Sequence, residues 1–235
     1  LVERFDRAGD PQQPQRRLYA SAHTVLRLAP QAVRGDPQRS YLNLGDRLRI
    51  WARESGDLPG QLREVWRRMA FNALVGNVDD HPLNHGVLHG GASSLGWRLA
   101  PAFDITPAVA TLSGPTEDGP LLSMATGVDG SARTSVVQLL AAAGHLGLEQ
   151  DAARVWLRDT AALVADHWEP MLRAAARPVM EDAARLDALA ADARVAFVYG
   201  EWLATPPAPP HAAAARPRSR PASARTPSAH PAAAG

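Results

Sequence analysis

The clearest hydrophobic pattern in the chain predicts a helix over residues 58–74. Apolar side chains recur there at intervals of three and four residues, which is the spacing of one helix face, while charged residues fall on the opposite face. The apolar positions are Leu62, Val65, Trp66, Met69, Ala70, Ala73 and Leu74. Gly76 follows as a natural C-terminal stop. Residues 77–84 are therefore expected to leave the end of a rigid support.

Capping residues and apolar spacing predict further helices on both sides of this one. Ser21 is a candidate N-cap for a short helix with Val25 and Leu28 inward, and Ser40 is one for a helix over 42–52. Stretches rich in Ala and Leu predict three more helices, over 134–143, 149–168 and 179–199. Short strands are expected only around residues 86–88 and 95–99, joined by a Gly90-Gly91 turn. The chain is thus predicted to be mainly α-helical, with one β-hairpin.

A change of composition divides the chain near residue 204. From Thr205 to Gly235 no apolar residue is larger than Ala, and Pro, Ala, Ser and Arg dominate. Such a segment cannot bury enough apolar surface to offset the entropy of ordering it. We therefore expect one domain over residues 1–203 and a disordered tail over 204–235.

Composition narrows the classes of function. The formal net charge is only +1, and no basic stripe alternates with aromatic residues, so direct binding of nucleic acid is not expected. The chain has no cysteine, which excludes disulfides and thiolate zinc sites and is compatible with a reducing cytoplasm. Because no apolar run approaches the length of a membrane span, we expect a cytoplasmic protein without membrane contact.

The stretch at residues 76–88, G-N-V-D-D-H-P-L-N-H-G-V-L, carries the candidate chemistry. Asp79 and Asn84 stand five residues apart, as do the proton-accepting Asp and the metal-binding Asn of protein-kinase-like phosphoryl transfer. Asp104 follows the predicted hairpin and could supply a second carboxylate. Oxygen ligands of this kind suit Mg²⁺. Acids and Asn are also common in capped loops after a glycine stop, so the spacing alone does not decide.

Four ordered blocks of the sequence resemble the HipA-like serine/threonine kinases, the toxins of bacterial type II toxin-antitoxin modules. The blocks are V-E-R-F-D-R at 2–7, S-Y-L-N-L at 40–44, F-N-A-L-V-G-N-V-D-D-H-P-L-N-H-G at 71–86 and G-W-R-L-A-P-A-F-D-I at 96–105. The resemblance implies the C-terminal lobe of a kinase-like fold.

The same resemblance implies a set of roles and partners. By it, Asp79 is the catalytic residue, Asn84 and Asp104 bind Mg²⁺, and Glu3 to Phe5 form the hinge that contacts the adenine of ATP. It also implies a protein substrate, in the best-known branch an aminoacyl-tRNA synthetase, and an antitoxin of the HipB type.

One departure from the kinase pattern bears on activity. All 25 residues of the Lys+Arg total are arginine, whereas kinase-like folds place a lysine from the smaller lobe against the nucleotide phosphates. Arginine does not replace such a lysine directly. We therefore expect the smaller lobe to lie upstream of this chain, and the isolated chain to be inactive or weakly active.

Two alternative functions remain open at the level of sequence. The chain could be a truncated, catalytically inactive fragment that acts only as a protein-binding module. It could also be a metal-dependent hydrolase built on His81, His85 and His89 with Asp79 or Asp80. Pro82 and Gly86 disfavour the continuous helix that such spacing uses. In the kinase interpretation His81 is expected to order the loop by hydrogen bonding.

Overall fold

The computed structural model describes residues 4–10, 12–90, 96–108 and 116–205. Its helices are α1 (Ala22–Val25), α2 (Tyr41–Trp51), α3 (Leu58–Leu74), α4 (Val136–His145), α5 (Gln150–Ala176) and α6 (Ala183–Ala204). Two 3-10 turns, Pro82–Asn84 and Thr116–Asp118, accompany them. The prediction of a mainly helical fold is confirmed.

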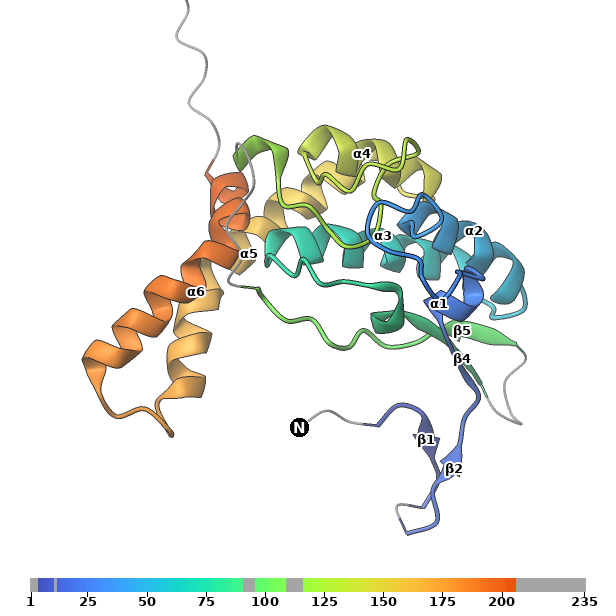
Figure 1. The fold of residues 1–235 in the computed structure, drawn as a ribbon, viewed down its shortest axis with the longest axis horizontal. Helices are drawn as coiled ribbons and strands as arrows, with labels where there is room; N and C mark the ends of the chain where they lie inside the picture. The colour runs from blue at the N-terminus through green and yellow to red at the C-terminus, as the bar shows by residue number, and fades with distance from the viewer. Residues whose placement is uncertain (1–3, 11, 91–95, 109–115, 206–235) are drawn as a thin grey trace, which may run out of the picture.

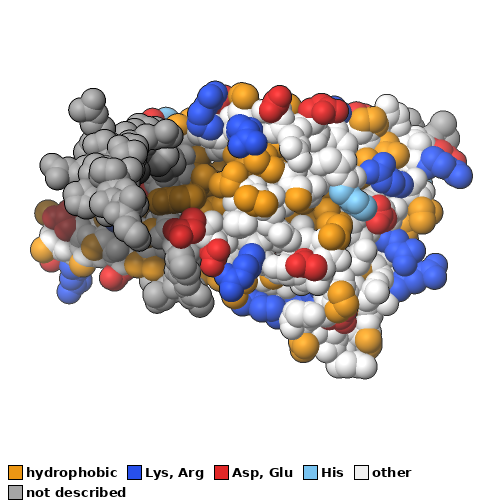
Figure 2. Space-filling model, turned by 90° about the horizontal axis from the view of Figure 1, so that it is seen from above, with side chains coloured by type: hydrophobic (Ala, Val, Ile, Leu, Met, Phe, Trp, Pro, Cys, Tyr) orange, Lys and Arg blue, Asp and Glu red, His pale blue; other side chains and the backbone are white. Residues whose placement is uncertain are grey.

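The helices form a body and a projecting arm. Helices α2, α3 and α4 lie together, and the α5–α6 hairpin extends to one side of them (Figure 1). On the face drawn in Figure 2, described arginine and acidic side chains are interspersed. None of the helices in the described part of the chain combines the length and hydrophobicity needed to cross a bilayer.

A small antiparallel sheet flanks α3 and has the strand order β3-β4-β5. Strands β4 (Gly86–His89) and β5 (Trp97–Leu99) form the predicted hairpin, with Val87 opposite Leu99. The expectation that strands occur only there is wrong. Strand β3 (Tyr19–Ser21) pairs with the other edge of β4, and β1 (Arg7–Ala8) pairs with β2 (Gln15–Arg16). These strands are too short to show a two-residue alternation.

The helix boundaries differ from the predicted ones mainly in the arm. Helix α3 has the predicted bounds, and α1 has the predicted Ser21 cap, with Val25 and Leu28 buried. Helix α5 continues past the predicted end through Pro170. Helix α6 begins at Ala183, after Asp182 caps it by accepting hydrogen bonds from the N–H groups of Ala184 and Arg185.

The core has two parts, and α3 belongs to both. The larger part packs α1, α2, α4 and the sheet around the first turns of α3, where Trp66 is fully buried and donates from Nε1 to the carbonyl of Leu139 at 2.8 Å. The smaller part joins the last turn of α3 to α5 and α6 around Tyr199. Helix α3 is thus fixed along its whole length.

The end of α3 is held close against α6 by Gly76. This glycine has φ 63°, and a Cβ there would collide with the backbone oxygen of Ala196 in α6. Only a residue without a side chain tolerates both the backbone conformation and the contact. The predicted glycine stop therefore also sets where the following loop begins. The predicted boundary at residue 203 stays a prediction, and the predicted tail lies outside the described residues from position 206 onward.

Candidate active site

The loop after α3 is built around the buried carboxylate of Asp80. This side chain is fully buried. It accepts a short hydrogen bond from the Tyr41 hydroxyl at the start of α2, and Oδ1 accepts the backbone N–H of Ser123 at 2.7 Å. One carboxylate thus joins three segments that are far apart in the sequence.

Two asparagines extend this contact back to α3. The Asn72 side chain donates to the Tyr41 hydroxyl at 2.8 Å, and Asn77 donates to Asn72 Oδ1 at 3.1 Å. The Tyr41 hydroxyl also lies 3.4 Å from His85 Nε2. We call Tyr41, Asn72, Asn77, Asp80 and His85 the loop network. Its members are all buried, and a buried polar network whose partners are satisfied fixes one arrangement of the chain.

Burial shifts the protonation of the loop network. It raises the pKa of Asp80 to about 7, although the hydrogen bonds from Tyr41 and Ser123 oppose the shift by favouring the carboxylate. It also lowers the pKa of His85 to about 3, helped by the positive charge of Arg68, so this imidazole is neutral. The pKa of Tyr41 is raised well above its usual value by burial and by Asp80, which keeps its hydroxyl a donor.

Asp79, the predicted catalytic residue, has the opposite environment from Asp80. Its side chain is exposed, while that of its neighbour is fixed inside. The backbone around it is ordered, because the Asp79 carbonyl accepts the N–H of His81 at 2.8 Å and the side-chain amide of Asn84 at 3.2 Å. The loop thus presents Asp79 to the outside from a fixed backbone.

Asn84 and the Asp104 segment meet at a small cavity. Asn84 is buried at the end of the 3-10 turn, and its donated hydrogen bond leaves the amide oxygen as the acceptor. The cavity that it lines with Asp80 is also lined by Phe103 and Ile105, the two neighbours of Asp104. Asp104 itself is exposed and has φ 56°, a conformation that Asp tolerates better than most residues.

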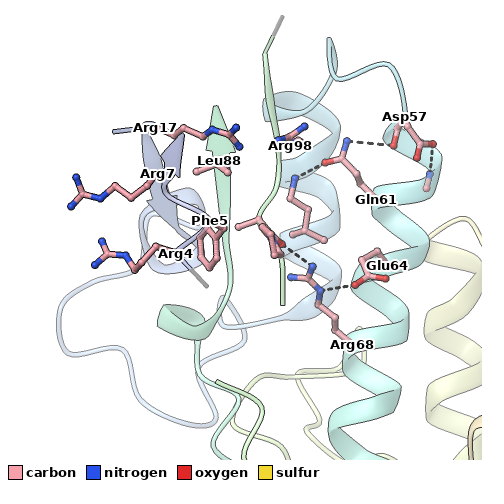
Figure 3. Close-up of a pocket in the computed structure, with 14 residues that line it drawn as sticks. Arg4, Phe5, Arg7, Arg17, Asp57, Gln61, Glu64, Arg68, Leu88 and Arg98 are labelled. Carbon is pink, nitrogen blue, oxygen red and sulfur yellow. Dashed lines mark hydrogen bonds and ion pairs between the residues drawn. The ribbon is translucent and has the colours of Figure 1, made fainter. Parts of the chain in front are cut away.

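Arg68 positions the strand that leads to Asp104. It is buried in α3, where Nε donates to Glu64 at 2.9 Å and Nη2 donates to the Ala100 carbonyl at 2.7 Å (Figure 3). The 17-residue helix that carries Asn72 therefore also holds the segment after β5. Sequence reasoning missed Arg68, Tyr41 and Asp80. The periodicity of α3 assigned its arginines to a solvated face, and nothing in the sequence marked Asp80, rather than Asp79, as the buried acid.

A larger cavity lies beside the N-terminal segment. It has a volume of about 510 Å³ and is lined by Phe5, Arg17, Leu88 and Arg98, among others (Figure 3). The Phe5 ring lies 5.4 Å from that of Phe103, measured between centroids, so the predicted hinge residue contacts the segment of Asp104. Glu3, the other predicted adenine contact, lies outside the described residues.

The histidine alternative finds no support in the geometry. Among the described residues, no group of three His, Asp or Glu side chains is close enough to hold a metal ion, and His85 is committed to the loop network. His81 orders the loop by hydrogen bonding, as expected, but it does so through its backbone. Its Nδ1 is buried without a hydrogen-bond partner, whereas its backbone orders the loop by accepting the N–H of Asn84 at 2.9 Å.

The residues present fit a magnesium–nucleotide complex in their chemistry. Asp79 and Asp104 are exposed carboxylates, and Asn84 offers an amide oxygen at the same end of α3. Mg²⁺ is usually held by one or two carboxylates together with phosphate oxygens of the nucleotide. Asp80 does not belong to this set, because both of its oxygens already accept hydrogen bonds inside the protein.

Comparison with known proteins shows the family of the chain. The model of the HipA-like C-terminal domain matches residues 1–168. The chain belongs to the HipA-like C-terminal domain family. The recognition made from the four sequence blocks is therefore confirmed, and the match includes all five predicted site residues, whose roles stay predictions.

A solved structure shows the same fold. It is HipA of Shewanella oneidensis MR-1, from a complex of the toxin-antitoxin system proteins HipA and HipB with operator DNA. Its sequence is 19% identical to that of the present chain, and the two structures superpose with a TM-score of 0.59. The match covers 86% of this chain and 47% of that one, so the chain spans about half the length of its solved relative. No curated protein matches the chain.

The raised pKa of Asp80 predicts a pH-dependent stability of the HipA-like domain. The folded pKa, about 7, lies above the reference value of 3.8, so the native state binds more protons between these values. The contribution of Asp80 to the free energy of unfolding is therefore fully present below pH 4 and is lost as the pH rises to about 7. Across this pH range the free energy of unfolding of the wild type should fall by a few kcal/mol, as an order of magnitude, relative to that of Asp80→Asn.

Urea unfolding of both proteins between pH 4 and pH 8 measures this difference. Asp159→Asn, at an exposed position on α5, controls for the loss of one carboxylate. Parallel curves for wild type and Asp80→Asn would show that Asp80 does not titrate as described.

Proposed function

We propose that this chain carries the proton-accepting and metal-binding part of an ATP- and Mg²⁺-dependent serine/threonine protein kinase. One observation carries the proposal: Asn84 lines a cavity with both neighbours of Asp104, and Asp79 is exposed on the same fixed loop. Membership in the HipA-like C-terminal domain family supports it. The three residues to which we assign proton acceptance and metal binding would thus act together at one end of α3.

Each side chain has a role that follows from its surroundings. Asp79 would accept the proton of a substrate serine or threonine hydroxyl, since its exposure lets a protein chain approach. Asn84 and Asp104 would supply metal ligands from two segments that α3 holds in place through the loop network and Arg68. Bound Mg²⁺ would neutralise charge on the ATP phosphates, which is where most of the catalysis in phosphoryl transfer arises. Phe5 would lie on the adenine side.

The absence of lysine sets a condition on this activity. Kinase-like folds use a lysine to hold the phosphates, and this chain has only arginine. We infer that the lysine comes from a segment outside these 235 residues. If no such segment exists, the protein-binding module is the alternative function, and the isolated chain transfers no phosphate.

Phosphate transfer by the full reading frame that contains this chain tests the assignment. Asp79→Asn should reduce the rate at least ~100-fold, because it removes the general base at nearly constant shape. Asp104→Asn should reduce the rate and raise the Mg²⁺ concentration needed, and Asn84→Ala should do the same more weakly. Radiolabelled ATP with a serine-containing protein substrate gives the readout.

Asp159→Asn is the matched control, since it removes one exposed carboxylate on α5 that does not line the cavity of Asn84 and should keep the wild-type rate. A wild-type rate in Asp79→Asn would show that the base is assigned wrongly. Robust transfer by the 235-residue chain alone would refute the requirement for an external lysine.

We also propose that the full protein pairs with an antitoxin of the HipB type and phosphorylates a protein such as an aminoacyl-tRNA synthetase. The solved relative comes from a complex with HipB, which supports the first part. That complex also contains operator DNA, so the expectation of no direct nucleic-acid contact gains no support from it. Co-purification of the full protein with the product of a neighbouring gene should succeed, and its consistent failure would count against the pairing.

A further inference from the structure

The connection between α1 and α2 contacts the loop that carries Asp79. Arg34 lies in this connection, and its Nη2 donates a hydrogen bond to the backbone carbonyl of Val78 at 3.0 Å. The two residues are 44 positions apart in the sequence, so the contact exists only in the folded chain. Within the ranges that the structure describes, Arg34 is the only hydrogen-bond donor to this carbonyl.

The peptide unit that Arg34 contacts is the one immediately before Asp79. The Cα of a residue lies between two peptide units, and its dihedral angles to both of them set where its side chain leaves the backbone. The unit after Asp79 is held from within the loop, because its carbonyl accepts the N–H of His81 at 2.8 Å and the side-chain amide of Asn84 at 3.2 Å. The unit before Asp79 is held by Arg34. Both sets of contacts together fix the direction of the Asp79 Cα–Cβ bond.

We propose that Arg34 is a positioning residue for Asp79. It acts through the backbone before Asp79 rather than on the reacting atoms. The inference rests on the proposed function, because Asp79 is the residue to which we assign proton acceptance. A general base must lie within hydrogen-bond reach of the proton that it accepts. A displacement of about 1 Å can lower the rate on the order of 100-fold, so a single surface contact has a large effect through the position that it sets.

A tight turn presents Arg34 to the loop. The N–H of Asp36 donates to the carbonyl of Val33 at 3.1 Å, which closes a β-turn with Arg34 and Gly35 at its centre. Gly35 has φ 92°, as the third residue of a type II turn requires, and glycine adopts this conformation without strain. The backbone of Arg34 is therefore fixed by the turn that contains it.

Buried Arg39 anchors the same connection to the body of the protein. Its Nη1 donates to the carbonyl of Ala32 at 3.3 Å, and its Nη2 donates to Ser123 Oγ at 2.6 Å. Ser123 is also the residue whose backbone N–H donates to Asp80. The connection and the buried acid are thus held by one segment, and Arg34 reaches the loop from a support that is fixed relative to it.

Direct binding of the protein substrate is the competing role for Arg34, since its side chain is exposed. The two roles differ in their kinetic effect. Loss of a positioning residue acts on the chemical step, so it lowers kcat and leaves KM for the protein substrate unchanged. Loss of a residue that binds the substrate equally before and during the reaction raises KM and keeps kcat.

Kinetics of the protein from the full reading frame, with radiolabelled ATP and a serine-containing protein substrate, separate these roles. Arg34→Ala should lower kcat at least ~10-fold, with KM for both substrates within about two-fold of the wild-type values. Arg34→Lys should keep kcat within about three-fold of wild type, because the contact is a single hydrogen bond rather than a bidentate pair. Arg154→Ala is the matched control, at an exposed position on α5 that does not line the cavity of Asn84. A wild-type kcat in Arg34→Ala, with or without a raised KM, would overturn the proposal.

Hydrogen exchange of the same proteins gives a readout that does not depend on phosphate transfer. In Arg34→Ala, backbone amides of residues 76–86 should exchange at least ~5-fold faster than in wild type, because the loop opens without breaking its contact with the connection. Arg154→Ala should exchange as wild type does. Unchanged exchange in Arg34→Ala would refute the role of Arg34 whatever the activity. A wild type that transfers no phosphate would refute the proposed function, and faster exchange would then show that Arg34 only holds the loop.

Discussion

The arrangement of the candidate site depends on the buried carboxylate of Asp80. A buried acid is costly unless its oxygens find donors, and this one finds them in the Tyr41 hydroxyl and the backbone of Ser123. Because the buried acid needs these donors, the loop after α3, the start of α2 and the segment around Ser123 must meet at one point. Because Asp80 is fixed inward, Asp79 is left exposed on the same short loop.

The other contacts of the site extend this constraint along α3. Asn72 and Asn77 connect the Tyr41 hydroxyl to the helix end, and Arg68, one turn earlier, holds the carbonyl of Ala100. Gly76 fixes the helix end against α6. A single helix thus positions the loop that carries Asp79 and Asn84 as well as the strand that leads to Asp104. A rigid support of this kind is what a site for positioned charge requires.

The sequence predicted those parts of the fold that have a local signal. The stripe of α3 and the serine caps of α1 and α2 are local, and each element forms close to its predicted position. The extension of α5 through Pro170 has no such local signal. Beyond the proline, Arg173 pairs with Glu169 in its own helix and with Asp187 in α6, both at 2.7 Å. Packing against α6 therefore stabilises a part of α5 that the sequence pattern does not mark as helical.

The candidate site divides in the same way. The five-residue spacing of Asp79 and Asn84, and the family blocks around them, could be identified in the sequence alone. The partners of Asp80 could not, because Tyr41 and Ser123 are 39 and 43 residues away and meet it only in the folded chain. Strand β3 was missed for a related reason, since its three residues are extended by pairing with β4 rather than by their own pattern.

A double-mutant cycle on Tyr41→Phe and Asp80→Asn tests most directly whether this contact holds the loop. Urea unfolding of the four proteins at pH 8, above the raised pKa of Asp80, gives the coupling free energy. A buried hydrogen-bonded pair should show coupling of about 1–3 kcal/mol. Additive effects of the two substitutions, within about 0.5 kcal/mol, would contradict the role assigned to Asp80.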